Sequence, residues 1–271
     1  MITIDKETFE RVVSAAASSD IQVFEAMTDA LTISNDKVQV TVLSHKLDFD
    51  TLPDRLRQDI IRYICLDAFY TAIPQLDLVL TPTGFGIVNN QNVSPASHDR
   101  VESLRTLVQN EAYNALDRVI TGLLGNEVWM MTANARMLVN SLFITSDQLR
   151  DYAGKKEASR SDLFGLRPLI SEAEELIFRE ISSEYLVHLI KGIREAGLSD
   201  DEILLVHELR QAVGFYINKQ LAAFRLKLAD VVNVLDADAD KYPVYAGSIA
   251  YKVKHFEHYR NEKDDTCYFW G

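Results

Sequence analysis

Glycine and proline are scarce in this sequence, with 11 Gly and 6 Pro among 271 residues. Both lie below their usual shares of about 7% and 5%. Because glycine and proline interrupt helices and form turns, so few of them favour long helices. The apolar share of 47% and the charged share of 25% are typical of a folded globular protein of one or two domains. The composition therefore predicts a mainly α fold and argues against a sheet-rich one.

Cysteine and basic residues are also in short supply. The two cysteines, Cys65 and Cys267, are too few and too far apart for a disulfide scaffold or a zinc site, and they fit reduced thiols in a cytosol. The 28 Lys and Arg residues are outnumbered by 40 Asp and Glu residues, for a net charge of −12. Nucleic-acid binding proteins usually present a basic face to phosphate, so specific nucleic-acid binding is not expected.

Long apolar runs are missing. The most apolar stretch, 119–143, is broken by polar residues such as Glu127 and Arg136, and falls short of the ~18 apolar residues of a membrane span. The first residues include Lys6 and Glu7 and lack the apolar centre of a signal peptide. Neither a membrane span nor export is expected.

Hydrophobic periodicity and capping patterns predict helices over most of the chain. Thr145 with Gln148, and Ser199 with Glu202, have the spacing of a capping box. Valines at 38, 40 and 42 alternate with polar residues, which predicts one strand over 38–42. Helices are expected as two short segments within 5–31, then over 51–74, 94–125, 145–153, 166–195 and 199–235, the last being the longest, while 126–143 fits neither period.

A protruding β-hairpin is expected at about 76–90. Leucines at alternate positions lead into the turn sequence Pro82-Thr83-Gly84, and Phe85 begins the return strand. Exposed strand edges recruit partner chains by strand addition, although the hairpin could equally be covered by its own subunit. The candidate partner contacts in this region are Leu80, Pro82, Gly84, Phe85 and Asn89.

Three consecutive aromatic residues, Tyr268, Phe269 and Trp270, lie near the end of the sequence. Large apolar side chains in a frayed segment are costly to leave in water. We therefore expect these three side chains to dock, either on their own chain or on a neighbouring one, and we include them among the candidate partner contacts.

Two histidine patterns resemble metal sites but are incomplete. His207-Glu208 begins like the helical motif of zinc proteases, yet Gln211 stands where the second histidine is required. His255 and His258 are three residues apart and could share a helical face, although a solvated face is the simpler interpretation. No catalytic or metal-binding residue is assigned on these patterns.

The acidic patterns also have simple explanations. Asp236, Asp238 and Asp240 alternate as in a calcium loop, but Lys241 occupies the position that requires glycine. Whether this run binds a cation stays open. Glu172, Glu174 and Glu175 fit an acidic helical turn favoured by the helix dipole. No cofactor and no enzymatic activity are expected.

The two halves of the chain are weakly alike, since Leu56-Arg57-Gln58 and Leu209-Arg210-Gln211 precede similarly spaced apolar residues. Coincidence and duplication are both compatible with this likeness. The expected architecture is a helical bundle of two lobes, related if the duplication is real: 1–130 with the hairpin, and 131–271 with an extended aromatic tail.

Several segments resemble an uncharacterised family of phage and prophage proteins from gut bacteria. The similar segments are 76–90 (LDLVLTPTGFGIVNN), 92–97 (NVSPAS), 144–152 (ITSDQLRDY), 163–174 (LFGLRPLISEAE) and the aromatic terminus. The family looks like virion structural proteins of the head-to-tail neck. The resemblance implies a connector or adaptor that forms a homo-oligomeric ring, contacts portal and tail or neighbouring neck proteins, and resides in the virion after synthesis in the host cytoplasm.

Two other hypotheses remain beside this one. The first is a monomeric assembly or binding module of a phage operon that holds one partner strand with the hairpin. The second, less favoured, is a metal-dependent hydrolase that uses His255 and His258. The mass of the protein in solution separates the first alternative from a ring, and metal analysis tests the second.

Overall fold

The computed structural model describes residues 2–14, 21–76, 79–81, 84–86 and 98–256. Its helices are α1 (Lys6–Val12), α2 (Ile21–Ala26), α3 (Thr28–Val38), α4 (Asp54–Leu76), α5 (His98–Leu123), α6 (Glu127–Met130), α7 (Ala133–Leu138), α8 (Ser146–Ala153), α9 (Arg160–Glu180), α10 (Ser183–Glu195), α11 (Asp200–Ile217), α12 (Leu221–Ala237), α13 (Pro243–Ala246) and α14 (Ile249–Lys254). Short π- and 3₁₀-helical turns are η2 (Gln39–Leu43), η3 (Phe49–Thr51) and η4 (Ala239–Lys241). The mainly helical fold class is confirmed.

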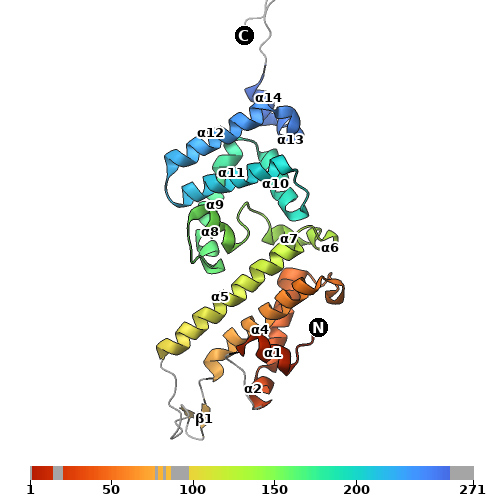
Figure 1. The fold of residues 1–271 in the computed structure, drawn as a ribbon, viewed down its shortest axis with the longest axis vertical. Helices are drawn as coiled ribbons and strands as arrows, with labels where there is room; N and C mark the ends of the chain where they lie inside the picture. The colour runs from red at the N-terminus through yellow and green to blue at the C-terminus, as the bar shows by residue number, and fades with distance from the viewer. Residues whose placement is uncertain (1, 15–20, 77–78, 82–83, 87–97, 257–271) are drawn as a thin grey trace, which may run out of the picture.

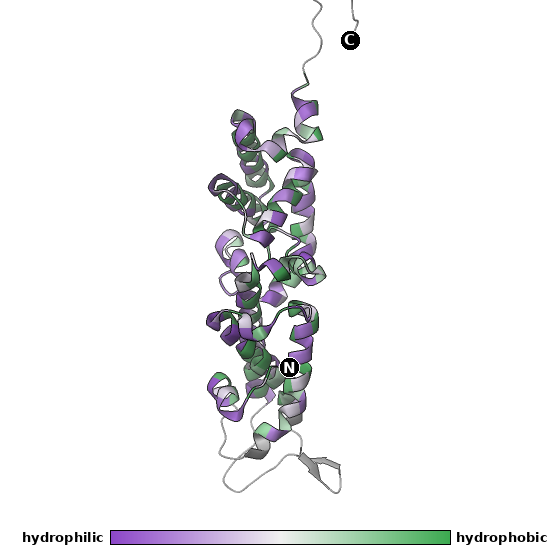
Figure 2. Cartoon of the chain, turned by 90° about the vertical axis from the view of Figure 1, so that its right-hand side faces the viewer, coloured by the Kyte–Doolittle hydropathy of each residue, from purple (hydrophilic) through white to green (hydrophobic). Residues whose placement is uncertain are grey.

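The molecule is elongated, with two hydrophobic cores placed one after the other along its length (Figure 1). The N-terminal core gathers buried residues from Ile2 to Val139 together with Ile144, and the C-terminal core gathers those from Leu142 to Tyr245. Figure 2 shows hydrophobic and hydrophilic residues mixed along most helices, as amphipathic helices require. Because α6 and α7 pack on the N-terminal core, the division between the two cores lies near residue 142.

The N-terminal core is built on α4 and α5, which lie side by side. Ile60 and Ile64 on α4, and Ala115 and Val119 on α5, are fully buried at helical spacing. Helix α4 begins at Asp54, after Pro53, and includes Pro74, so it starts three residues later and ends two residues later than the helix predicted over 51–74. Gly125 closes α5 as expected, with a left-handed φ of 76°.

The predicted strand over 38–42 is wrong. Helix α3 runs to Val38 and continues into the π-helical turn η2. Val38 and Val42, four residues apart, are buried, and Val40 between them is exposed. This is the spacing of a helix, although the alternation of valines with polar residues predicted a strand. The widened turn leaves carbonyls available to neighbours: Trp129 Nε1 donates to the Val42 carbonyl at 2.8 Å. Tertiary contacts thus decide this segment.

The helix predicted over 166–195 is two helices. Helix α9 begins earlier, at Arg160, capped by Ser159, and accommodates Pro168 in its interior. The first helix ends at Glu180, and Ile181 and Ser182 separate it from α10. The Ser182 hydroxyl caps α10 by accepting a hydrogen bond from the Tyr185 amide at 3.2 Å. Both helices bury side chains in the same core, so the apolar stripe continues across the break.

The single long helix predicted over 199–235 is also wrong. Helices α11 and α12 are separated by a turn in which Lys219 has a φ of 59°. Asn218 Nδ2 fixes this turn by donating to the Ala153 carbonyl at 2.9 Å. On α11, Gly214 lies so close to α8 that an added Cβ would be 1.9 Å from the Tyr152 carbonyl oxygen. The two helices fold back on each other and bury one continuous stripe.

The described part of the hairpin region contains two short strands, β1 (Val79–Thr81) and β2 (Gly84–Gly86). They pair antiparallel, with Leu80 opposite Phe85. A hairpin that extends over 76–90 is not supported, since the strands are limited to these segments within the described residues. In Figure 1, β1 lies at the end of the molecule opposite α14.

Candidate functional site

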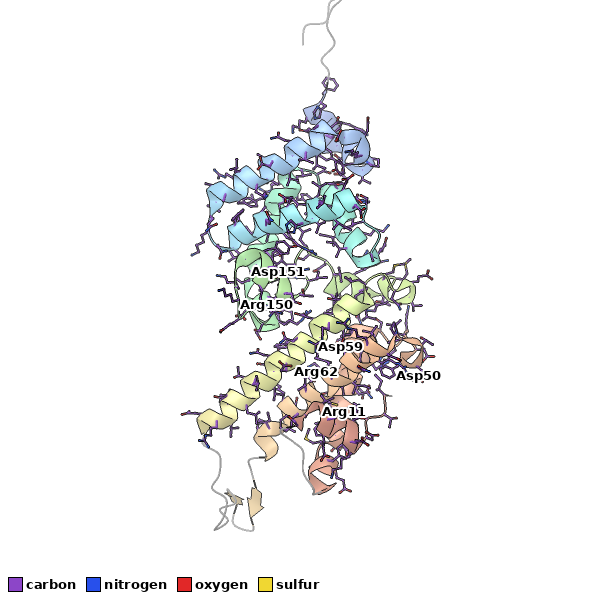
Figure 3. All side chains as sticks on the ribbon, viewed as in Figure 1. Arg11, Asp50, Asp59, Arg62, Arg150 and Asp151 are labelled. Atoms are coloured by element: carbon purple, nitrogen blue, oxygen red, sulfur yellow. The ribbon has the colours of Figure 1, made fainter. Side chains whose placement is uncertain are left out.

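The main concave feature is a row of three adjoining cavities, of about 580, 420 and 580 Å³, which we call the junction groove. The first two cavities share Asp59 and Arg118, and the second and third share Thr121 and Asp147. The row therefore runs from the end of α1, across α4 and α5, to the junction between the two cores. Figure 3 shows Arg11 and Asp59 on the lower part of the molecule along this path.

Arginines dominate the α1 end of the junction groove. Arg118 Nε lies 2.7 Å from Asp59 Oδ1, and Arg62 Nη2 lies 3.0 Å from an oxygen of Glu111. Arg11 and Arg55 are exposed and have no ion-pair partner among the residues that the structure describes. Four arginines thus meet three carboxylates, since Asp147 lines the same cavity as Arg55. In a chain whose net charge is −12, this end carries a small local excess of positive charge.

The middle of the groove is formed where α4 approaches α5 closely. Pro53 and Leu56 lie on one side and Gly122 on the other. A Cβ added to Gly122 would be 3.0 Å from Leu56 Cδ1, so a larger side chain at this position would push into the Leu56 side chain. Because Gly122 has no side chain, the apolar Leu56 side chain can lie against α5 at the floor of the middle cavity.

The far end of the groove, between α8, α10 and α11, has a largely apolar wall. Its apolar lining residues are Leu124, Ile144, Ile193, Ala196, Leu198, Ile203 and Val206. Exposure of 53% at Ile203 leaves a large apolar side chain at the rim. Apolar surface of this kind on a concave site favours aromatic or aliphatic groups of a binding partner.

Polar side chains also line this end, among them Asp147, Asp151, Tyr152, His207 and Arg210. The Tyr152 hydroxyl is 3.1 Å from His207 Nδ1, and Gln211 Nε2 is 2.8 Å from His207 Nε2. Arg210 Nε donates to the Leu142 carbonyl at 2.8 Å, and burial lowers the pKa of its guanidinium. His207 and Gln211 of the zinc-protease-like pattern therefore form a hydrogen-bonded network with Tyr152, while Glu208 pairs with Lys227.

A buried ion pair joins α5 of the N-terminal core to α9 of the C-terminal core. Asp117 on α5 pairs with Arg160 at the start of α9, and both side chains are almost fully buried. The other Asp117 oxygen accepts hydrogen bonds of 2.7 Å from both the amide and the hydroxyl of Ser146, the first residue of α8. Asp117 belongs to the N-terminal half of the chain and Arg160 to the C-terminal half. Sequence reasoning missed this pair, since Asp117 carries no motif and only interrupts the stripe of α5.

The acidic run at the end of α12 is occupied by partners from its own chain. Asp236 accepts a hydrogen bond of 2.6 Å from the Tyr245 hydroxyl, contacts Lys254, and lies 3.1 Å from His255 Nε2. Burial alone would raise the pKa of Asp236, but the hydrogen bonds from Lys254 and Tyr245 lower it. Asp238 pairs with Lys241 at 2.9 Å.

In the part of the chain that the structure describes, no group of three or more His, Cys, Asp or Glu side chains is arranged to hold a metal ion. His258 lies outside that part, so the predicted pair of His255 and His258 stays untested.

The three glutamates of α9 have separate environments. Glu174 is half-buried, and one of its oxygens accepts hydrogen bonds of 2.7 Å from the Ser141 hydroxyl and the Leu142 amide. Burial raises the pKa of Glu174. Glu175 pairs with Arg179 on the exposed side of the helix. Glu174 thus ties α9 to the segment that joins the two cores.

Exposed apolar residues gather beside η2, on α6 and α7. Val40, Met131 and Met137 are exposed by 56%, 66% and 67%. Asn134 Nδ2 donates to the Val40 carbonyl at 2.5 Å, which brings η2 and α7 together. At the far end of the molecule, Ile249 and Val253 are one turn apart on α14 and at least 70% exposed.

The predicted partner contacts are only partly covered by the structure. Leu80 lies in β1, and Gly84 and Phe85 lie in β2. The remaining candidates lie outside the described residues: Pro82, Asn89, Tyr268, Phe269 and Trp270. Their role as contacts stays a prediction.

One protein family shows similarity to part of the chain. Residues 23–136 match the model of DUF6712, a family of unknown function. The match includes α3 to α6 and all of the arginine end of the groove except Arg11, and it stops before α8. No curated protein and no solved structure matches the chain. Among the described helices, none is long and apolar enough to cross a membrane.

Proposed function

We propose that this chain is a virion structural protein of a phage or prophage, an adaptor of the head-to-tail connector that assembles into a homo-oligomeric ring. Portal and tail, or neighbouring neck proteins, are its proposed partners. The protein is made in the host cytoplasm and carried in the virion. Its role is to hold other chains in place, and no bond-making step is assigned to it.

One observation carries this proposal: an elongated body with exposed apolar side chains on the surface near each of its two cores. The buried Asp117–Arg160 pair joins the cores. Met131 and Met137 are exposed beside the N-terminal core, and Val253 is exposed beyond the C-terminal core. Exposed apolar groups on rigid elements are typical of protein–protein contact surfaces.

The charge of the chain also suits a channel through which DNA passes. A net charge of −12 repels phosphate, so the genome would slide past such a surface without adhering. The acidic balance supports a position at the neck only together with ring formation, since many soluble proteins are acidic.

Light scattering coupled to size-exclusion chromatography, followed by electron microscopy, tests the proposal. The expected result is a closed ring whose mass is a whole multiple of 30.7 kDa, alone or with the neighbouring virion proteins. Deletion of 267–271 should weaken assembly and leave the far-UV circular dichroism unchanged. A protein that stays monomeric under all these conditions contradicts the proposal, and a one-to-one complex with one partner favours the binding-module alternative.

A further inference from the structure

We propose that the junction groove binds residues 257–271 of a second copy of this chain. The inference rests on the proposed homo-oligomer and names the contact that builds it. The groove supplies a basic end at Arg11 and Arg55 and an apolar end at Leu198 and Ile203. The segment supplies the complementary groups in the same order.

The first part of 257–271 has four acidic and two basic residues and is therefore net acidic. Asp264 and Asp265 are adjacent and precede the aromatic run of Tyr268, Phe269 and Trp270. Carboxylates pair with guanidinium groups through charge-assisted hydrogen bonds, and aromatic side chains fill apolar pockets at interfaces. On an acidic chain, a basic groove that meets an acidic segment of the same chain also removes like-charge repulsion between copies.

The distance between the acidic and aromatic residues of the segment agrees with the distance between the basic and apolar ends of the groove. Arg118 lines the basic cavity, and Leu124, which follows the last residue of α5, lines the apolar one six residues further along the chain. Six residues of helix rise by about 9 Å. An extended chain covers about 10 Å in three residues, which is the separation of Asp265 from Tyr268. The acidic and aromatic groups can therefore reach both ends of the groove at once.

A second copy fits better than the same chain. In Figure 1, α12, α11 and α8 lie between α14 and the α4–α5 pair. Neighbouring helices pack about 8–10 Å apart, and a segment that follows α14 in the same chain would have to pass all three of these helices to reach α5. The eight residues from 257 to 264 span about 26 Å when fully extended. Docking of a neighbour's segment avoids this limit and is head-to-tail, the geometry that closes into rings.

Photo-cross-linking of the full-length protein tests this contact. A benzophenone amino acid replaces Phe269, and equal amounts of ¹⁵N-labelled and unlabelled protein are assembled together before irradiation. Mass spectrometry then identifies the cross-linked residues and the isotope content of each partner. We expect cross-links to groove residues such as Leu198, between α10 and α11, and Ile203, on α11, in pairs that join labelled to unlabelled chains.

Charge reversal provides the matched comparison. The double variant Arg11→Glu/Arg55→Glu changes two exposed groove arginines and should lower the yield of interchain cross-links at least tenfold. Lys219→Glu/Arg225→Glu makes the same change in net charge on exposed residues outside the groove and should leave the yield unchanged. If the first variant loses helical signal, Tyr268→Ser/Phe269→Ser/Trp270→Ser serves instead, with the benzophenone placed at Thr266.

The outcomes separate the contact from the proposed function. Cross-links confined to one chain, or to sites away from the groove, overturn the inference. When a ring is seen by microscopy in the same sample, such a result leaves the proposed function standing. A sample that stays monomeric and gives no interchain cross-links overturns both.

Discussion

Substitution of Asp117 is expected to be among the most damaging single changes in this protein. Asp117→Asn keeps the shape of the side chain and one acceptor for Ser146, but it removes the negative charge opposite Arg160. The guanidinium is then left almost fully buried without a counter-charge, and its Nε already has no hydrogen-bond partner among the described residues. Removal of one member of a buried ion pair costs about 3–5 kcal/mol.

This loss is large relative to the ~5–15 kcal/mol that stabilises a typical domain. Urea denaturation followed by circular dichroism measures the free energy of unfolding. Arg160→Met should cost a similar amount, because it leaves the Asp117 carboxylate buried and paired only with Ser146.

The double variant is the informative one. Asp117→Asn/Arg160→Met removes both charges and retains an acceptor for Ser146, so we expect it to lose about 1–2 kcal/mol, less than either single variant. Arg179→Met, which breaks the exposed pair with Glu175, is the control and should change stability by less than about 1 kcal/mol. Additive losses in the double variant would refute the argument that the two charges stabilise the junction as a unit.

Three further predictions concern single residues of α4, α9 and α11. Gly214→Ala should destabilise the protein by about 3 kcal/mol, because its Cβ would overlap the Tyr152 carbonyl, whereas Gly165→Ala, with open space around it, should stabilise the helix by about 0.5–1 kcal/mol; urea midpoints compare the two. Because burial raises the pKa of Glu174 in the folded state, this carboxyl binds its proton more tightly there than in the unfolded chain, and its contribution to stability falls as pH rises from about 4.5 through the folded pKa. Glu174→Gln should remove that decline, and equal pH slopes for both proteins between pH 4 and 7 would contradict it. Burial raises the pKa of the Cys65 thiol to about 12, so iodoacetamide at pH 8 should alkylate Cys65 in urea but not in the folded protein, as peptide mass mapping would show.

Local sequence patterns predicted the helix ends that are stabilised by neighbouring residues. The capping boxes at Thr145–Gln148 and Ser199–Glu202 are present as expected, and Gly154 ends α8 with a left-handed φ of 66°. These features depend on side chains three or four residues apart, so the sequence alone contains the interaction.

The groove could not be predicted in the same way. Its lining comes from α1, α4, α5, α8, α10 and α11, which are far apart in the sequence. Arg11 and Arg118 are 107 positions apart and carry no shared motif. The hairpin and the aromatic segment could be predicted as contact elements from the sequence because each is a contiguous run of unusual residues.

The sequence by itself determined that this chain is helical, since scarce glycine and proline and continuous apolar stripes leave few other ways to bury 47% apolar residues. The tertiary structure decided where those stripes break. Residues 218–220 turn because Asn218 finds the Ala153 carbonyl, and 38–43 stay helical because α6 and α7 use their backbone oxygens. An apolar stripe looks the same whether one helix or two bury it, and only contacts between distant residues distinguish the two.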